Sequence, residues 1–318
     1  MSQPRIAVLG AGAFGKNHIR IIHEAADVQL SGILDSDPTR AQAAADERGC
    51  PVFGTLEEVA AASDAAVIAT PTITHAEFGC RLMELGCDVL VEKPIAHDEA
   101  AGQALIDTAA RTGRILQVGH LERFNPAVTA LAKVVSTPLF FEIHRMSEFS
   151  PRSLDVDVVL DLMIHDLDVV LSLVGVMPDE IRAAGIHVMS EKVDIANVRL
   201  QFPGGCVANM TASRISTERI RKLRLFQPRE YISLDYSRQD GARFSVDANR
   251  SVSFAPLAAM KSEPLRLELE NFFECIRTRQ QPRVTGKAAL DALKVALAIL
   301  DKIEEHSKLV ALHVPGTP

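Results

Sequence analysis

The chain has 318 residues, which is enough for about two domains of ordinary size. Hydrophobic residues make up 47% and charged residues 24%, so the chain can bury a large core and does not have the composition of a disordered protein. The net charge of −7, the absence of Trp and the presence of only two Tyr argue against nucleic-acid binding, which relies on basic surfaces and stacking rings.

The cysteines and the apolar segments exclude two further classes of protein. The five cysteines are scattered without a C-x-x-C spacing, so the sequence predicts neither a disulfide framework nor a zinc knuckle. No uninterrupted apolar stretch approaches the roughly 18–20 residues of a membrane span, and the stretch before Gly10 is too short for the core of a signal peptide. We therefore expect a soluble cytoplasmic protein with neither a membrane nor a nucleic-acid partner.

Short β-branched runs alternate with helical periods over the first 120 residues. The runs lie at 6–9, 28–34, 66–69, 88–91 and 115–118, and helix-like stretches lie between them at 41–48, 76–85 and 99–111. This alternation is typical of βαβ units in a parallel sheet that is buried on both faces. The sequence predicts a doubly wound α/β domain over residues 1–121.

The pattern changes after Pro126. An amphipathic stretch at 156–173 precedes strand-like runs at 181–189, 195–202, 206–213, 223–227 and 231–236, with turns at 203–205 and 228–230. Two helical stretches follow, at 265–278 and 288–305. Strands followed by helices indicate an α+β domain with a mostly antiparallel sheet, which we expect over residues 122–318.

A glycine-rich turn follows the first predicted strand. Gly10, Gly12 and Gly15, together with Ala13 and Phe14, fit the pattern G-x-G-x-x-G at the start of a helix. The first glycine allows a tight turn, the second a close approach to a pyrophosphate and the third close packing of helix on sheet. The free N–H groups of the helix N-terminus then face the phosphates. The turn predicts dinucleotide binding.

An acidic residue at the end of the second predicted strand supports this interpretation. Asp35 lies 20 residues beyond Gly15, where a carboxylate binds the hydroxyls of the adenosine ribose. Asp35 and Asp37 would repel the 2′-phosphate of NADP, so we expect NAD, although Arg40 leaves NADP open. A glycine turn without a ligand and an S-adenosylmethionine site are the alternatives.

Two more segments follow predicted strands, where open α/β sheets present ligands. Thr70, Pro71 and His75 follow the third strand, and Glu92 and Lys93 end the fourth. We expect all five to contact the cofactor. The ammonium of Lys93 can also hydrogen-bond a substrate hydroxyl and stabilise the developing alkoxide. An exposed, solubilising lysine is the alternative.

The amphipathic stretch carries an acid–histidine pair. Asp161 and His165 are four residues apart and share one face of a helix, and Asp168 follows three residues later. Asp161 can orient His165 and stabilise its imidazolium while the ring removes a proton from a hydroxyl. A surface ion pair and a metal site of these three residues are alternatives, but we expect no metal because hydride transfer does not need one.

Together, GAGAFG, ATPTITH, EKP and D-x-x-x-H resemble, in this order, the Gfo/Idh/MocA oxidoreductases over essentially the whole chain. The resemblance implies a Rossmann domain followed by a large open sheet that often mediates homodimers or homotetramers. It also implies that Lys93, Asp161 and His165 are the catalytic group, with His165 as the acid/base.

Positive charge indicates the class of substrate. Six basic residues lie between 214 and 229, and Arg123, Arg145 and Arg152 flank the acid–histidine stretch. Guanidinium groups match phosphate oxygens, so we expect a phosphorylated or nucleotide-linked sugar, with solvated strand faces as the alternative.

Three further segments resemble the family members that oxidise the 3-hydroxyl of UDP-N-acetylglucosamine for lipid A biosynthesis: 118–126, 149–153 and 211–214. The resemblance implies substrate contacts from residues in or near these segments and from the catalytic group, namely Lys93, Arg123, Asn125, Arg145, Arg152, Asp161, His165 and Arg214. A dehydrogenase of a free polyol or aldose such as inositol and a non-catalytic NAD-binding regulator are the alternatives. The regulator would be expected to lack the lysine that is present at position 93.

Overall fold

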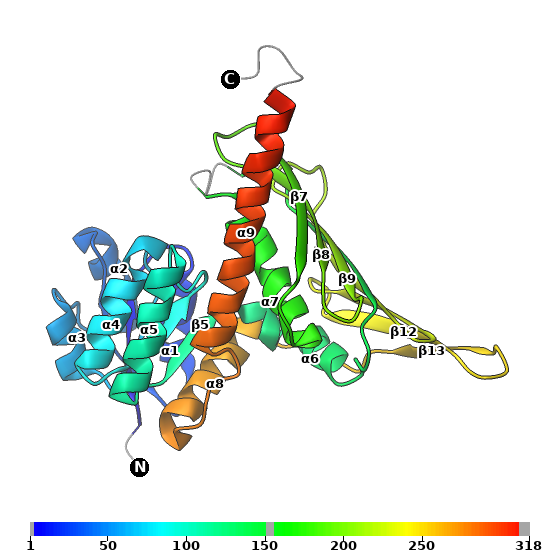
Figure 1. Cartoon of the computed structure of the whole chain (residues 1–318). Helices are drawn as coiled ribbons and strands as arrows, with labels where there is room; N and C mark the ends of the chain where they lie inside the picture. The colour runs from blue at the N-terminus through cyan, green and yellow to red at the C-terminus, as the bar shows by residue number, and fades with distance from the viewer. Residues whose placement is uncertain (1–2, 151–155, 312–318) are drawn as a thin grey trace. The chain divides into compact units, whose positions relative to one another are not determined.

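The computed structural model describes residues 3–150 and 156–311, and the chain divides into two compact units (Figure 1). The first unit comprises Met1–Leu121 and Glu263–Leu290, and the second comprises Glu122–Ser262 and Asp291–Pro318. The break after Leu121 coincides with the predicted boundary. The prediction that residues 122–318 form one domain needs a correction, because the segment Glu263–Leu290 belongs to the first unit.

The first unit is built around a five-stranded parallel sheet. Its strands are β1 (Arg5–Leu9), β2 (Gln29–Leu34), β3 (Ala65–Ile68), β4 (Asp88–Glu92) and β5 (Leu116–Gly119), in the order β2-β1-β3-β4-β5. The connections contain α1 (Gly15–Glu24), α2 (Pro38–Arg48), α3 (Leu56–Ala62), α4 (His75–Glu84) and α5 (Glu99–Thr112). The strands β1, β3 and β4 are almost wholly buried, which confirms the doubly wound α/β fold.

Helix α8 (Pro264–Thr278) joins this unit through its apolar face. Leu269, Phe272 and Phe273 are buried in the same core as residues of β1 and α1. Ion pairs from Arg266 to Glu24 and from Arg277 to Asp27 attach the polar face of α8. Burial of these large side chains outweighs the distance along the chain, so α8 folds with the N-terminal residues.

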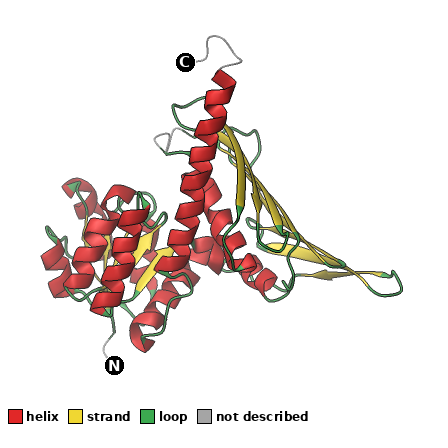
Figure 2. Ribbon diagram, in the orientation of Figure 1, coloured by secondary structure: helices red, strands yellow, loops and turns green. Residues whose placement is uncertain are grey.

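The second unit contains an eight-stranded sheet in the order β13-β12-β11-β10-β6-β9-β8-β7. The strands are β6 (Phe140–Met146), β7 (Glu180–Ile186), β8 (Ile195–Gln201), β9 (Val207–Ser213), β10 (Ile220–Gln227), β11 (Glu230–Asp235), β12 (Asp240–Val246) and β13 (Val252–Pro256). All neighbours are antiparallel except β6 and β9, so the predicted large, mostly antiparallel sheet is confirmed. Helices α6 (Pro126–Ala132), α7 (Ile164–Val174) and α9 (Gly286–Ala311) lie along one face of it (Figure 2).

Sequence patterns did not reveal β6, β12 and β13. Strand β6 alternates buried and half-buried residues but carries Glu142, His144 and Arg145 among its apolar residues. Strands β12 and β13 are short of large apolar side chains and β13 is exposed throughout, so they show little hydrophobic alternation.

The helix predicted over 156–173 has an irregular start. Residues Val159–Met163 form a π-helical turn, in which the N–H of Ile164 donates to the carbonyl of Val159, and α7 follows directly. Asp161 of the predicted acid–histidine pair therefore lies in a π turn, and His165 lies in α7. Such turns are rare and often occur at functional sites.

The described residues contain neither a membrane-spanning helix nor a cluster of metal ligands. No helix there is long and apolar enough to cross a bilayer. Across residues 3–150 and 156–311, no group of three or more His, Cys, Asp or Glu side chains has the arrangement of a metal site.

Candidate functional site

The glycine turn lies where β1 is flanked by β2 on one side and β3 on the other, which is the point where α/β sheets bind ligands. Gly10 has a φ of +90°, and a Cβ there would lie 2.5 Å from the carbonyl oxygen of Ala69. A Cβ on Gly15 would lie 1.8 Å from the carbonyl oxygen of Gly10, whereas a Cβ on Gly12 would meet no atom within 4 Å. Gly10 and Gly15 are thus required by packing, and Gly12 leaves open space at the turn.

A cavity of about 970 Å³ opens beside this turn, in the size range of ligand pockets. Five of the predicted cofactor-binding residues line it: Gly10, Gly12, Asp35, Thr70 and Pro71. Ala13, Phe14 and Gly15 belong to the turn but do not line the cavity. His75, Glu92 and Lys93, which follow or end β3 and β4, do not line it either. Arg40, Phe53 and Phe78 line it as well, and the patterns that we used did not predict the two aromatic residues.

Asp35 carries the charge at one end of the cavity. Its carboxylate accepts hydrogen bonds from the N–H of Ala11 at 2.6 Å and from Nε and Nη2 of Arg40 at 3.0 and 2.6 Å. Burial opposes ionisation of Asp35, but Arg40 and the backbone N–H groups of Asp37 and Ala11 outweigh it, so the pKa of Asp35 lies below its ordinary value. An ionised acceptor beside the glycine turn suits the two hydroxyls of a ribose, and the residues present fit a dinucleotide.

His75 joins the segments that follow β3 and β4. Its Nε2 lies 2.9 Å from the carbonyl oxygen of Thr70, and its Nδ1 lies 3.0 Å from that of Pro94. Burial lowers the pKa of His75, so the neutral ring donates to one of these carbonyls. His75 therefore shapes the wall of the site instead of lining the cavity as the glycines do.

Glu92 supports the segment that carries the predicted catalytic lysine. Its Oε1 lies 2.8 Å from Nε2 of the fully buried His18, and its Oε2 accepts a hydrogen bond from the backbone N–H of Lys93 at 3.2 Å. A Cβ on Gly119 would lie 2.9 Å from this carboxylate, so glycine leaves room for it. The buried pair with His18, which sequence patterns did not reveal, holds Lys93 directly beyond the end of β4, where its side chain is half-buried.

Asp161 and His165 lie in the second unit, in the π turn and the first turn of α7. Asp161 is half-buried, and His165 is 9% exposed. The N–H of Asp161 donates to the carbonyl of Asp157 at 2.9 Å, so the helical hydrogen bonding begins before the π turn. The acid and the imidazole are close together along one helical segment, as an acid/base pair requires.

Arg145, for which the sequence predicts a contact with substrate, has its observed contacts within the protein. Its side chain is 2% exposed, and its Nε and Nη2 donate to the two oxygens of Asp166 at 2.6 and 2.9 Å. Nη1 donates to Glu122 at 3.1 Å, and the guanidinium lies 5.0 Å from the ring centroid of Tyr236. These carboxylates hold the pKa of Arg145 above its usual value despite burial. The guanidinium thus fixes α7, one residue beyond His165, to the sheet.

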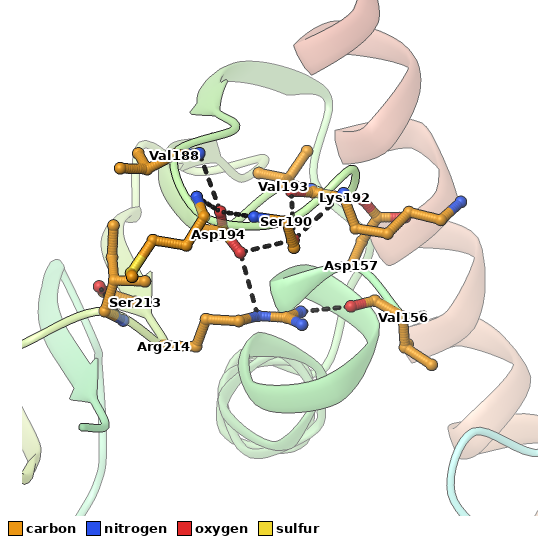
Figure 3. Close-up of polar contacts among 11 residues, drawn as sticks. Val156, Asp157, Val188, Ser190, Lys192, Val193, Asp194, Ser213 and Arg214 are labelled. Carbon is orange, nitrogen blue, oxygen red and sulfur yellow. Dashed lines mark hydrogen bonds and ion pairs between the residues drawn. The ribbon is translucent and has the colours of Figure 1, made fainter. Parts of the chain in front are cut away.

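Arg214 also binds within the protein, where the sequence predicts a contact with substrate (Figure 3). Its side chain is 7% exposed, and its Nη2 donates to the carbonyl of Val156. Its Nε lies 3.8 Å from Oδ1 of Asp194. Arg214 therefore connects the end of β9 to the residues that precede the π turn.

Asp194 is the centre of this cluster (Figure 3). Its Oδ2 accepts the N–H groups of Val188, Met189 and Ser190 at 2.8, 2.7 and 3.0 Å, and its Oδ1 accepts the Ser190 hydroxyl at 2.7 Å. Burial opposes ionisation, but these hydrogen bonds outweigh it and hold the pKa of Asp194 at about 2. The carboxylate thereby closes the loop between β7 and β8.

Replacing Asp194 with asparagine is expected to remove a stabilisation that depends on pH. The pKa of Asp194 is lower in the folded state than in the unfolded chain, so its contribution is complete above about pH 5 and is lost as the pH falls towards 2. The shift corresponds to about 2 kcal/mol. The free energy of unfolding, measured from pH 7 to pH 3 for both proteins, should show a difference that shrinks as the pH falls. A constant difference would contradict this role for the carboxylate.

The remaining predicted residues are placed as follows. Asn125 is buried, caps α6 through the N–H of Ala127, and donates to the side chain of Glu122 and the carbonyl of Tyr236, so it too has an internal role. Arg123 is 18% exposed and lies 3.4 Å from Asp168. Arg152 lies outside the described residues.

Models of two protein families match the chain. "Oxidoreductase family, NAD-binding Rossmann fold" matches residues 4–120, and "GFO/IDH/MocA C-terminal domain" matches residues 134–228. Together these matches cover well over half of the chain.

Known proteins with similar sequences are dehydrogenases. The chain is 34% identical to a UDP-N-acetylglucosamine 3-dehydrogenase of Acidithiobacillus ferrooxidans, over 96% of this chain and 98% of that protein. A solved structure of the dehydrogenase of that name from the same organism has a TM-score of 0.91 at 33% identity, over 96% and 99% of the two chains. An inositol 2-dehydrogenase of Rhizobium meliloti is 31% identical over 67% of this chain and 69% of that protein. The chain therefore belongs to the GFO/IDH/MocA family and is an NAD-dependent oxidoreductase.

Proposed function

We propose that the protein oxidises the 3-hydroxyl of UDP-N-acetylglucosamine to a ketone, with NAD as the oxidant. The observation that carries this proposal is the similarity to the dehydrogenase of Acidithiobacillus ferrooxidans, which extends over 96% of this chain and so includes both units. The cavity beside the glycine turn supports it, because the residues there fit the dinucleotide that the reaction consumes.

In this proposal, three residues of the chain act on the substrate or support the one that does: His165, Asp161 and Lys93. The residues of the glycine turn and Asp35 would hold NAD, which would supply the acceptor for the hydride of the sugar carbon. His165 removes the proton of the hydroxyl as general base, and Asp161 orients the imidazole and stabilises its charged form. Lys93 donates a hydrogen bond to the same oxygen while negative charge develops on it. The substrate loses one hydride and one proton, which balances the oxidation of an alcohol to a ketone.

Formation of NADH tests the substrate. Purified protein mixed with NAD and UDP-N-acetylglucosamine is expected to show an increase in absorbance of NADH, since both the sugar and the nucleotide are present. N-acetylglucosamine without the nucleotide is the matched control, and we expect little or no reaction with it. Equal rates with both sugars would contradict a nucleotide-sugar substrate.

Oxidation of inositol is the second candidate function. It is favoured by the 31% identity to an inositol 2-dehydrogenase over 67% of this chain. Myo-inositol added to the same assay distinguishes the two, because a polyol dehydrogenase would reduce NAD with inositol and not with the nucleotide sugar.

The preference for NAD over NADP depends in this proposal on Asp35, whose carboxylate repels a 2′-phosphate. Asp35→Ser removes that charge and breaks the two hydrogen bonds from Arg40. The Nε and Nη2 groups of Arg40 are then free to bind the phosphate. We expect the ratio of kcat/KM for NAD to that for NADP to fall roughly 10- to 100-fold, in line with the loss of a charged hydrogen-bond acceptor. Asp46→Ser on the exposed side of α2 is the control. An unchanged ratio in both variants would remove the role assigned to Asp35.

We also propose that the protein forms a homodimer or homotetramer, lies in the cytoplasm and acts in lipid A biosynthesis. The homodimer or homotetramer is supported by a row of aromatic rings across β6 and β10 to β13, in which Phe254 is 63% exposed. The cytoplasmic location and the place in lipid A biosynthesis are supported by the kinship with nucleotide-sugar dehydrogenases alone.

A further inference from the structure

Two arginines of the second unit lie directly opposite each other on neighbouring strands. Arg145 of β6 and Arg221 of β10 are register partners in the antiparallel pair. Partners share one face of a sheet, and the alternation of buried residues along both strands shows that this is the face that packs into the core. Like charges in such a position destabilise a sheet unless anions neutralise them.

The available carboxylates neutralise only one of the two arginines. Asp166 and Glu122 are both bound by the guanidinium of Arg145, at distances between 2.6 and 3.1 Å. Arg221 forms no ion pair with any carboxylate of residues 3–150 and 156–311. Its Nε is buried and has no hydrogen-bond partner in the described part of the chain. A buried donor without a partner is costly, so an acceptor that reached Arg221 would be bound favourably.

The charge balance favours an anion at this place. Burial and the repulsion of Arg145 and Arg219 lower the pKa of Arg221 to about 10, against the weaker opposing effect of Glu122 and Asp166. Arg221 therefore remains protonated at neutral pH, and its charge is only partly compensated. An anion would accept hydrogen bonds from the guanidinium group of Arg221 and offset the repulsion from Arg145 and Arg219.

Two other arginines of the same basic stretch, Arg214 and Arg224, have partners within the protein. Arg214 donates to the carbonyl of Val156. Arg224, three residues after Arg221, has its side chain on the opposite face of the sheet, where it donates to Glu142 at 3.0 Å. Of the remaining basic residues of this stretch, Arg219, Lys222 and Arg229 are exposed, and Arg221 is half-buried.

We propose that Arg221 binds the diphosphate of the nucleotide-linked substrate. Arg221 pairs in register with Arg145, which binds Asp166, and Asp166 directly follows His165. This series of contacts connects Arg221 with the helix that carries the proton acceptor. The inference rests on the proposed function for the identity of the ligand, but its anionic character rests on the contacts of Arg221.

Binding of UDP tests the proposal without relying on turnover. Calorimetric titrations with UDP are made in saturating NAD, so that the dinucleotide cavity is filled, for the wild type, Arg221→Gln and Arg224→Gln. Arg224→Gln is a matched control, because it removes the same charge from the same strand on the opposite face. We expect Arg221→Gln to weaken UDP binding roughly 10- to 100-fold, and Arg224→Gln to change it by about twofold or less. Uridine, which lacks the diphosphate, should not distinguish the three proteins.

Thermal unfolding separates binding from a structural role. Removal of Arg221 relieves its repulsion with Arg145, so Arg221→Gln should unfold at the same temperature as the wild type or at a higher one. Arg221→Lys keeps the charge without the fork and should bind UDP with intermediate affinity. A lower unfolding temperature of Arg221→Gln with unchanged affinity for UDP would assign a structural role to Arg221 and overturn the inference.

The outcomes distinguish this inference from the proposed function. If the wild type oxidises UDP-N-acetylglucosamine and Arg221→Gln has an unchanged KM for it, the inference fails and the function stands. If the wild type does not oxidise that sugar but binds UDP through Arg221, the function fails and the anion site stands. If the wild type does not bind UDP at all, the anion site is refuted.

Discussion

Replacement of Lys93 or His165 with alanine is expected to lower kcat by about 100- to 10,000-fold, the usual contribution of a positioned acid, base or hydrogen-bond donor. In the proposed mechanism, Lys93→Ala removes the ammonium that stabilises the developing alkoxide, and His165→Ala removes the group that accepts the proton. Binding of NAD should survive in both variants, because neither residue lines the cavity beside the glycine turn. Single-turnover rates and NAD titrations measure the two effects separately.

Variants of the same residue types provide the controls. Lys133→Ala and His23→Ala change exposed side chains and are expected to leave turnover unaltered. The double variant of Lys93 and His165 should lose less activity than the product of the single losses, if both groups act on one oxygen as proposed. Turnover retained in both single variants would refute the proposed mechanism. Full multiplication of the two losses would show that the residues act independently.

Replacement of Arg145 with methionine is expected to destabilise the protein by about 3–5 kcal/mol, because it leaves two buried carboxylates without their cation. Asp166 is 1% exposed and Glu122 is 5% exposed, so water cannot replace the guanidinium. The unfolding temperature should fall by roughly 10 °C. Differential scanning calorimetry at neutral pH measures the change.

The control for Arg145 removes an ion pair at the surface. Arg182→Met breaks the pair with Glu180, and the Arg182 side chain is 77% exposed, so a change of less than about 1 kcal/mol is expected. Arg145→Met combined with Glu122→Gln and Asp166→Asn should recover part of the loss, because no unpaired charge then remains in the core. Equal effects of Arg145→Met and Arg182→Met would contradict the internal role of Arg145.

Local sequence patterns were sufficient to predict the glycine turn and Asp35, which line the dinucleotide cavity. The geometry of the glycine turn depends on residues close together in the chain, and Asp35 follows it at the end of the next strand. The hydrophobic runs of β1, β3 and β4 likewise reflect burial on both faces of the sheet. Sequence therefore predicted the parallel sheet of the first unit and five of the residues that line its cavity.

Tertiary structure decided the roles of the arginines. Arg145 and Arg214 look like ligands for an anion in the sequence, but one binds Asp166 and Glu122 and the other binds Val156. These partners are 21 to 58 residues away along the chain, and no spacing rule connects them.

The sequence by itself determined the βαβ pattern, the dinucleotide turn and the acid–histidine pair, because each arises from neighbours along one strand or helix. Only the tertiary structure decided that α8 folds with the first unit, that β6 lies within the second sheet, and that Arg221 is left without a carboxylate. The physical reason is that burial and charge neutralisation act between side chains that meet in space. Which carboxylate reaches which arginine is fixed by the pairing of whole strands and helices.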